Sequence, residues 1–195
     1  MSEALFVQYI KNTIPNFLVS EEGIQKIVGA FEWMPLAKNE YLLRQGKISG
    51  YYILLKGHMR AYTTNEAGIE ITTNFFSGER VVFEGASFFM RQPSEENVVT
   101  LTDCEGFFTT FEKLNALFHE VPEFREFGRA ILVKECISAQ KQKLAYFNQS
   151  AEQRYSQLLQ QSPDLMQAAQ LRHIASFLGI TDTSLSRIRR ELSKK

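Results

Sequence analysis

The chain has 195 residues, of which 44% are apolar and 23% are charged, and its 22 basic side chains balance 22 acidic ones. This length suits one or two globular domains whose core needs no disulfide or metal. The longest apolar runs, such as residues 51–55, are too short to span a membrane, and the first residues lack the features of a secretory signal. We therefore expect a cytoplasmic protein with no membrane partner, in which Cys104 and Cys136 are two buried free thiols.

The overall charge of zero conceals an uneven distribution. Residues 1–133 carry 12 basic and 17 acidic side chains, whereas residues 134–195 carry 10 basic and 5 acidic ones. An excess of positive charge in one part of a chain indicates a polyanionic partner for that part. On charge alone, the basic part could equally be a helical surface that faces solvent.

The first two thirds of the chain change from a helical to a strand pattern. Residues 3–33 have the apolar spacing of helices, and Ser20 followed by two glutamates suits a helix start. Residues 38–111 contain short aromatic and β-branched runs separated by glycines at about ten-residue intervals, which predicts an antiparallel sandwich or barrel. The clearest strands are residues 51–55, 59–64, 69–76, 98–102 and 107–111, with a hairpin turn at residues 65–68.

A long helix is predicted for residues 122–148. Apolar side chains recur along it in a broken stripe, formed by Phe124, Phe127, Ile131, Ile137 and Leu144. Such a helix reaches about 39 Å, which is more than a small β domain can cover. We expect half of the stripe to join the core and half to pair with a second copy in a homodimer; the alternative is an ordinary core helix.

Helical signals continue to the C-terminus. Ser150 and Gln153 have the spacing of a capping box, and Pro163 suits the first position of a further helix. The expected organisation is a β domain at residues 1–121, a dimerisation helix at residues 122–148 and an all-α domain at residues 149–195.

Residues 171–192 predict two helices joined by a tight turn. Gly179 suits the left-handed end of the first helix, and Thr181 suits the cap of the second. Apolar positions at three- and four-residue spacing face inward; these are Leu171, Ile174, Ala175, Leu178, Leu185, Ile188 and Leu192. The outer face of the second helix then consists of Asp182, Thr183, Ser184, Ser186, Arg187, Arg189 and Arg190.

That outer face has the chemistry of a helix-turn-helix that reads DNA. Arg187 can donate two hydrogen bonds to guanine in the major groove. The hydroxyls of Thr181, Ser184 and Ser186 suit phosphate oxygens. Sequence-independent attraction is expected from Arg189, Arg190, Lys194 and Lys195. The alternative is an αα-hairpin whose basic face is merely solvated.

Two segments resemble the Crp/Fnr family of bacterial transcription regulators. They are IASFLGITDTSLSRIRREL at residues 174–192 and GKISGYYILLKGHMRAY at residues 46–62, whose turn glycines match the β-roll pattern. The resemblance implies an α+β fold: an N-terminal antiparallel, jelly-roll-like β-roll of the cyclic-nucleotide-binding type, a long dimerisation helix and a C-terminal all-α helix-turn-helix domain. It also implies a homodimer on a near-palindromic double-stranded DNA site, with RNA polymerase as a further partner.

The resemblance places base-reading positions on Asp182, Thr183 and Arg187, and a phosphate-contacting cap on Thr181. With the flanking Ser184, Ser186 and Arg190, these residues form the expected DNA site. Two features depart from the family. The β-hairpin wing usually found before the helix-turn-helix is not visible, and Asp182 stands where arginine is common.

The family's phosphate cassette aligns with residues 83–97. Glu84 and Gly85 lie near its acidic and glycine positions, but Pro-Ser-Glu-Glu-Asn at residues 93–97 replaces the arginine that holds the cyclic phosphate. Arg91 could reach in from upstream, so Glu84, Gly85 and Arg91 are the candidate effector residues. We expect no cyclic AMP binding of the family's usual kind, and no cofactor.

Other sensing chemistries have little support in the sequence. Two cysteines are too few for an all-cysteine iron–sulfur cluster, and haem would need a lone ligand such as His58 or His119. An aromatic run could line an apolar ligand pocket or simply be roll core; it comprises Phe75, Phe76, Phe83, Phe88 and Phe89.

Two rival functions remain. An enzyme on a β-roll would need clustered metal ligands or a nucleophile–base pair, whereas His58, His119 and His173 are isolated. We therefore expect neither catalytic residues nor a metal. The second rival is an effector-binding signalling module whose C-terminal helices dock a protein instead of DNA.

Overall fold

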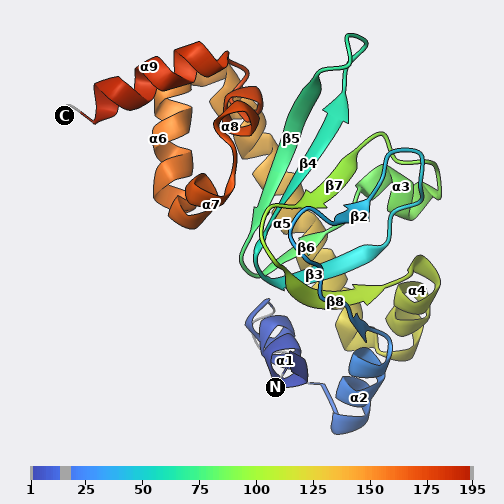
Figure 1. Cartoon of the computed structure of the whole chain (residues 1–195). Helices are drawn as coiled ribbons and strands as arrows, with labels where there is room; N and C mark the ends of the chain where they lie inside the picture. The colour runs from blue at the N-terminus through green and yellow to red at the C-terminus, as the bar shows by residue number, and fades with distance from the viewer. Residues whose placement is uncertain (1, 14–18, 194–195) are drawn as a thin grey trace.

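The computed structural model describes residues 2–13 and 19–193, which form two β-sheets, a long helix and a C-terminal group of helices (Figure 1). The first sheet has the strand order β1 (Glu32–Trp33), β8 (Glu105–Thr109), β3 (Tyr51–Lys56) and β6 (Arg80–Val82). The second has the order β2 (Tyr41–Leu43), β7 (Asn97–Thr100), β4 (His58–Thr64) and β5 (Glu70–Ser77). All neighbouring strands in the described residues are antiparallel. The predicted α+β fold with an antiparallel β-roll is confirmed.

Strand β3 is buried on both faces, which explains its unbroken apolar sequence. Tyr52 and Leu54 point into the space between the two sheets and pack with Met59 of β4. The opposite face of β3 carries Tyr51 and Ile53, which pack against α1 (Ser2–Thr13), α2 (Glu21–Gly29) and the start of the long helix. Alternate side chains of one strand thus join two separate cores.

The predicted hairpin turn joins β4 to β5. The Asn65 backbone N–H donates to the Ile69 carbonyl at 3.0 Å, and the Gly68 N–H donates to the Asn65 carbonyl at 2.9 Å. Gly68 has a φ of +77°, which glycine adopts without strain. The hairpin prediction is confirmed, and the hairpin projects from the roll in Figure 1.

One helix lies inside the predicted strand region of residues 38–111, and a second begins at the last residue of that region. Helix α3 (Gly85–Met90) interrupts the β region because the Glu84 carboxylate accepts hydrogen bonds from the backbone N–H groups of Ala86 and Ser87 at 3.0 and 2.8 Å. Helix α4 (Phe111–Glu120) begins at the Thr110 cap and buries Leu114. The two phenylalanines of α3 favour a strand, and this preference concealed the Glu84 cap in the sequence.

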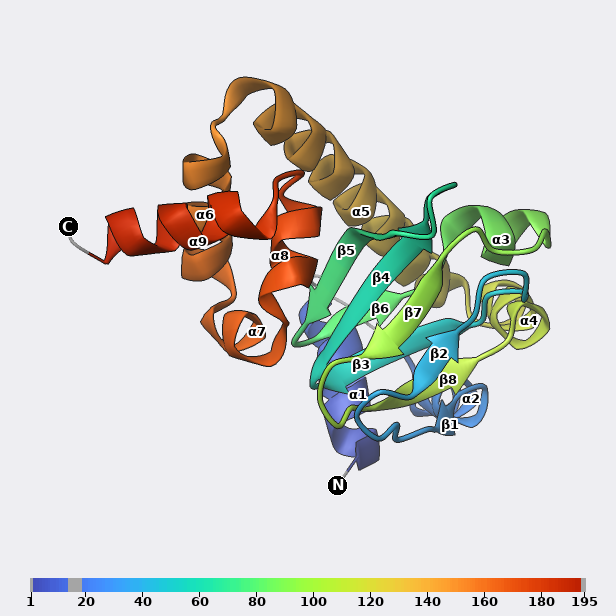
Figure 2. The same ribbon diagram turned by 45° about the horizontal axis from the view of Figure 1, so that its top comes forward.

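The C-terminal part is helical, as predicted. Its helices are α5 (Pro122–Asn148), α6 (Ala151–Gln161), α7 (Pro163–Ala168), α8 (Leu171–Phe177) and α9 (Asp182–Leu192). The capping box at the start of α6 is confirmed: Gln153 N–H donates to Ser150 Oγ at 3.2 Å, and Ser150 N–H donates to Gln153 Oε1 at 2.8 Å. Figure 2 shows α5 running along the roll and beyond it to the C-terminal helices.

The cysteine prediction is half wrong. Cys104 is buried in the core between the two sheets, but Cys136 is exposed on α5, because it lies beyond the part of that helix that the roll covers. None of the described helices combines the length and the apolar content needed to cross a bilayer.

Candidate nucleic-acid interface

The predicted helix-turn-helix consists of α8 and α9, which meet at Gly179. Gly179 has a φ of +67°, the left-handed conformation expected at this helix end. The Ile180 N–H donates to the Ala175 carbonyl at 3.0 Å, which closes the turn. Thr181 Oγ1 accepts a hydrogen bond from the Ser184 N–H at 3.2 Å and thereby caps α9. The predicted turn and cap are confirmed.

Helix α9 has one face in a core and the other in solvent. Leu185 and Ile188 are buried against Ile174 of α8, Leu178 directly after α8, and Tyr155 of α6. This packing holds the helix in place, so the side chains of the opposite face are presented in fixed directions. Among the described residues of this region, helices α6, α7 and α8 occupy the segment before α9, so no β-hairpin wing stands there.

Five of the seven predicted DNA-site residues line one open concavity on the solvent side of α9, with a volume of about 370 Å³. These are Thr183, Ser184, Ser186, Arg187 and Arg190. Thr181 and Asp182 instead line a second hollow, between α9 and the β4–β5 hairpin. Arg187 Nε lies 3.9 Å from Glu191 Oε1, an exposed pair that holds the guanidinium only weakly. Lys194 and Lys195 lie outside the described residues.

The helix-turn-helix also packs directly on the roll, which the sequence did not predict. The Thr72 N–H of β5 donates to Ser176 Oγ of α8 at 2.9 Å, and this hydroxyl donates to the Glu70 carbonyl at 3.3 Å. Close by, the rings of Phe75 and Phe177 meet edge to face with centroids 5.2 Å apart. Helix α8 is therefore attached to an edge strand of the second sheet, so that the two parts of the chain are mechanically connected.

A buried polar group lies behind this contact. The Arg60 side chain is almost fully buried; its Nη1 lies 2.7 Å from Glu70 Oε2, and its Nε donates to Thr72 Oγ1 at 2.9 Å. His173 of α8 is 8% exposed, and among the described residues its two ring nitrogens have no hydrogen-bond partner. Its Nε2 lies 4.0 Å from Glu70 Oε2. Burial lowers the pKa of His173 to about 4, with further lowering by Arg60 and Arg172, against the opposing charges of Glu70 and Asp182.

Because the buried His173 resists protonation, we expect the folded protein to lose stability in mild acid. The unfolded chain takes up a proton on His173 near pH 6.5, whereas the folded chain does so only near pH 4. The contribution of neutral His173 to the free energy of unfolding is therefore complete above pH 6.5. It is lost as the pH falls to 4, and the loss is about 3 kcal/mol at most. Urea unfolding of the wild type and of His173→Gln at the two ends of this range measures it. The wild type should lose more stability than the variant, and equal losses would contradict the assignment.

The candidate effector residues lie at the two ends of α3. The Glu84 carboxylate caps α3 and Gly85 is its first residue, whereas Arg91 follows its last turn. Arg91 Nη2 lies 3.2 Å from Glu112 Oε1 of α4, and its guanidinium lies over the Phe111 ring. The structure therefore does not bring Arg91 together with Glu84, and their role in effector binding stays a prediction.

The other candidates for sensing are distributed over the roll. His58 Nδ1 lies 2.8 Å from Ser77 Oγ, and His119 is exposed on α4. Within the described part of the chain, no group of three His, Cys, Asp or Glu side chains could hold a metal ion. The aromatic run divides: Phe75, Phe76 and Phe88 are buried, whereas Phe83 and Phe89 line an apolar cavity.

The long helix α5 changes environment along its length. Phe124, Phe127 and Ile131 are buried under the roll, as the core half of the stripe requires. Beyond them, Ile137, Leu144 and Phe147 are 47%, 60% and 71% exposed. Together with Val133 and Gln140 they recur at alternating four- and three-residue steps, the spacing of a coiled-coil seam; we call Val133, Ile137, Gln140, Leu144 and Phe147 the α5 seam.

Comparisons with known proteins agree with this architecture. Residues 33–120 match the family model of the cyclic nucleotide-binding domain. No curated protein sequence matches the chain. Among solved structures, the chain is similar to CLP of Xanthomonas campestris, a c-di-GMP responsive global regulator, at 16% identity over 90% of this chain and 92% of that one, with a TM-score of 0.69.

Two further structures have the same arrangement. FixK2 of Bradyrhizobium japonicum is 16% identical over 84% of this chain and 85% of its own, with a TM-score of 0.71. The catabolite activator protein of Thermus thermophilus is 18% identical over 90% and 84%, with a TM-score of 0.54. At these identities the likeness shows the fold, which is that of the Crp/Fnr regulators.

Proposed function

We propose that this chain, which has the fold of the Crp/Fnr regulators and a segment of the cyclic nucleotide-binding type, is a homodimeric, sequence-specific DNA-binding transcription regulator. The observation that carries the proposal is the two-sided character of α9. Its apolar face is fixed in a core, and its hydroxyl- and arginine-bearing face surrounds one solvent-facing concavity. A rigid helix that presents such a face suits the major groove.

Within this proposal, the residues of α9 divide into two roles. Arg187, with Asp182 and Thr183, reads base edges, because the resemblance to the Crp/Fnr helix-turn-helix places the base-reading positions on these three residues. Ser184, Ser186 and Arg190 contact phosphates, together with the α9 N-terminus at Thr181. The Thr181 hydroxyl also donates to Ser184 Oγ at 3.0 Å, so it must exchange this bond to reach a phosphate.

The α5 seam is the proposed contact between two copies. A two-fold axis along this seam would place two α9 helices on one face of the dimer, to enter successive major grooves about 34 Å apart on a near-palindromic site. The division of the chain follows: a sensor at residues 1–121, a dimerisation helix at 122–148 and a DNA-binding domain at 149–195. RNA polymerase is a further partner within the same proposal.

Signal transfer has a route in the contacts that join the roll to α8. An effector that moves the roll against α5 also moves β5, and with it the Thr72–Ser176 hydrogen bond and the Phe75–Phe177 ring contact. Repositioning of the paired α9 helices is the proposed output.

The alternative function is a signalling module whose C-terminal helices dock a protein. The salt dependence of binding distinguishes DNA binding from protein docking. Binding to DNA releases counterions from phosphates and therefore weakens steeply as salt rises. An apolar protein interface is much less sensitive. The exposed face of α9 is polar and basic in the described residues, which favours DNA.

Replacing Arg187 by alanine tests the assigned base contact. On the DNA site that the wild type selects, Arg187→Ala is expected to cost about 1–3 kcal/mol and to relax the preference at one base pair in each half-site. Arg189→Ala is the matched control: Arg189 is exposed on the same helix but does not line the concavity, so it should weaken all sequences alike. Fluorescence anisotropy with single-base variants of the site measures both. An unchanged preference in Arg187→Ala would refute the assignment.

A further inference from the structure

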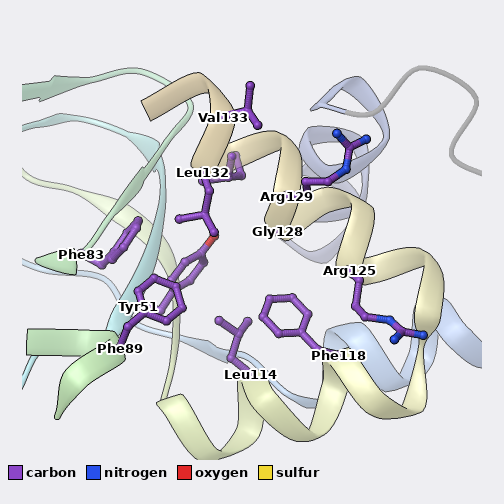
Figure 3. A pocket seen from close by; sticks show the side chains of 11 residues that line it. Tyr51, Phe83, Phe89, Leu114, Phe118, Arg125, Gly128, Arg129, Leu132 and Val133 are labelled. Atoms are coloured by element: carbon purple, nitrogen blue, oxygen red, sulfur yellow. The ribbon is translucent and has the colours of Figure 1, made fainter. Parts of the chain in front are cut away.

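An apolar cavity of about 290 Å³ lies between the roll and the helices α3, α4 and α5 (Figure 3). Its walls include Tyr51 and Phe83 from the roll, Phe89 of α3, Phe118 of α4 and Leu132 of α5. Neither Glu84 and Gly85 nor Arg91 lines it. Apart from two arginines at one end and the hydroxyl of Tyr51, the side chains that line it are apolar, so the cavity suits a mainly apolar molecule.

One buried polar group faces this apolar space without a partner. The residue Tyr51 is 3% exposed, and among the described residues its hydroxyl makes no hydrogen bond, although its oxygen is not one of the fully buried unpartnered atoms and opens onto the cavity. Figure 3 shows the Tyr51 oxygen directed from β3 toward α5. Burial raises the pKa of Tyr51 well above its ordinary value, so the hydroxyl remains a neutral donor. A donor that opens onto an apolar cavity and has no protein acceptor is available to an acceptor oxygen on a ligand.

Positive charge lies at the other end of the cavity. The side chains of Arg125 and Arg129 complete its lining on α5. Arg129 is engaged with Glu126, at 2.6 and 2.9 Å, whereas Arg125 has no ion-pair partner among the described residues. Figure 3 shows both guanidinium groups directed away from the ring-lined part, so the positive charge lies at its margin. An anionic group there would gain a partner while staying near solvent.

We propose that this cavity binds an amphipathic organic acid, with its carboxylate near Arg125, its apolar body between the aromatic rings, and a second oxygen that accepts a hydrogen bond from Tyr51. The cavity volume corresponds to a chain of roughly six to twelve carbons. Leu132 lies next to Val133 of the α5 seam, so a ligand in the cavity would change how two α5 helices pair. The role of the cavity as an effector site therefore rests on the proposed function. As a binding site it does not depend on DNA.

Three probes of equal chain length separate the two polar contacts. They are an ω-hydroxy acid, the plain fatty acid that lacks the inner oxygen, and the diol that lacks the charge, each in a series of roughly six to twelve carbons. Isothermal titration of the full chain should show one saturable site per chain for the hydroxy acid at its best length. Both the fatty acid and the diol should bind several-fold more weakly, and cyclic AMP and cyclic GMP should not displace the hydroxy acid.

Two variants assign the contacts. Tyr51→Phe should weaken the hydroxy acid about tenfold and abolish its advantage over the fatty acid. Arg125→Gln should weaken both acids about threefold to tenfold at low salt and leave the diol unchanged. The matched controls are Tyr146→Phe and Lys143→Gln, which alter α5 outside the cavity and should bind like the wild type. Thermal melts of each variant confirm that it is folded.

Several outcomes overturn the inference. They are the absence of saturable binding across the series, equal binding of acid and diol in the wild type, equal weakening of the two acids by Tyr51→Phe, and displacement by a cyclic nucleotide. The last would assign the cavity to a nucleotide. A chain that binds the acid but not DNA would sustain the cavity and refute only the proposed function.

Discussion

Replacing Ile137 and Leu144 together by glutamate is expected to convert the protein from a dimer to a monomer. Both side chains are exposed in the single chain and belong to the α5 seam. In a two-fold dimer each substitution occurs twice, so four apolar contacts are lost and four like charges are placed at the seam. Because the two side chains are only about half exposed in the single chain, each contact contributes about 0.75–1.5 kcal/mol. The total is on the order of 3 kcal/mol or more, which weakens dimerisation by at least about 10²-fold.

Sedimentation velocity and DNA binding measure this effect. The monomeric variant should lose the affinity that comes from engaging two half-sites at once. Ala139→Glu is the matched control, because Ala139 is exposed on α5 but lies outside the seam, and it should remain dimeric. A double variant that stays dimeric would show that two copies meet elsewhere, and a wild type that is monomeric would remove the seam's assigned role.

Leu185→Ala is expected to unfold the helix-turn-helix. Leu185 is fully buried at the centre of the C-terminal core, between Ile174, Leu178 and Ile188. Removing a buried leucine side chain costs about 2–5 kcal/mol, because it leaves a cavity as well as losing burial. A group of four short helices has little stability to spare. DNA binding should therefore disappear while the roll remains folded.

Hydrogen exchange resolves the two parts of the chain in this variant. The amides of α8 and α9 should exchange rapidly, and those of β3 and β4 should stay protected. Leu159→Ala is the matched control, because Leu159 is half exposed on α6 and its truncation should cost far less. If Leu185→Ala unfolded the roll and the helices in one transition, residues 149–195 would not fold as a separate domain, which would contradict the proposed division of the chain.

Local chemistry accounts for the parts of the fold that the sequence predicts well. Gly179, Thr181 and the Ser150–Gln153 capping box act over three or four residues, so their spacing alone identifies them. The outer face of α9 follows from the same periodicity. The DNA-contacting roles of its residues are not tested by the fold and stay proposals.

Contacts between segments distant in sequence could not be predicted. Ser176 is a small polar residue on a short helix, and no local pattern connects it with Thr72, which lies 104 positions earlier. Tyr51 belongs to a strand that is buried on both faces, so its unpartnered hydroxyl emerges only when α3, α4 and α5 close around it. The sequence predicts a buried thiol at Cys136, whereas its position on α5 beyond the roll leaves it exposed.

Selection of bound sequences from a pool of random double-stranded DNA tests sequence-specific regulation by a dimer most directly. The purified full chain is predicted to enrich one motif with two-fold symmetry, whose half-site centres lie about 34 Å apart. Its affinity for that motif should fall steeply and linearly in logarithmic terms as salt rises. No enriched motif, or a motif without two-fold symmetry, would contradict the proposed function.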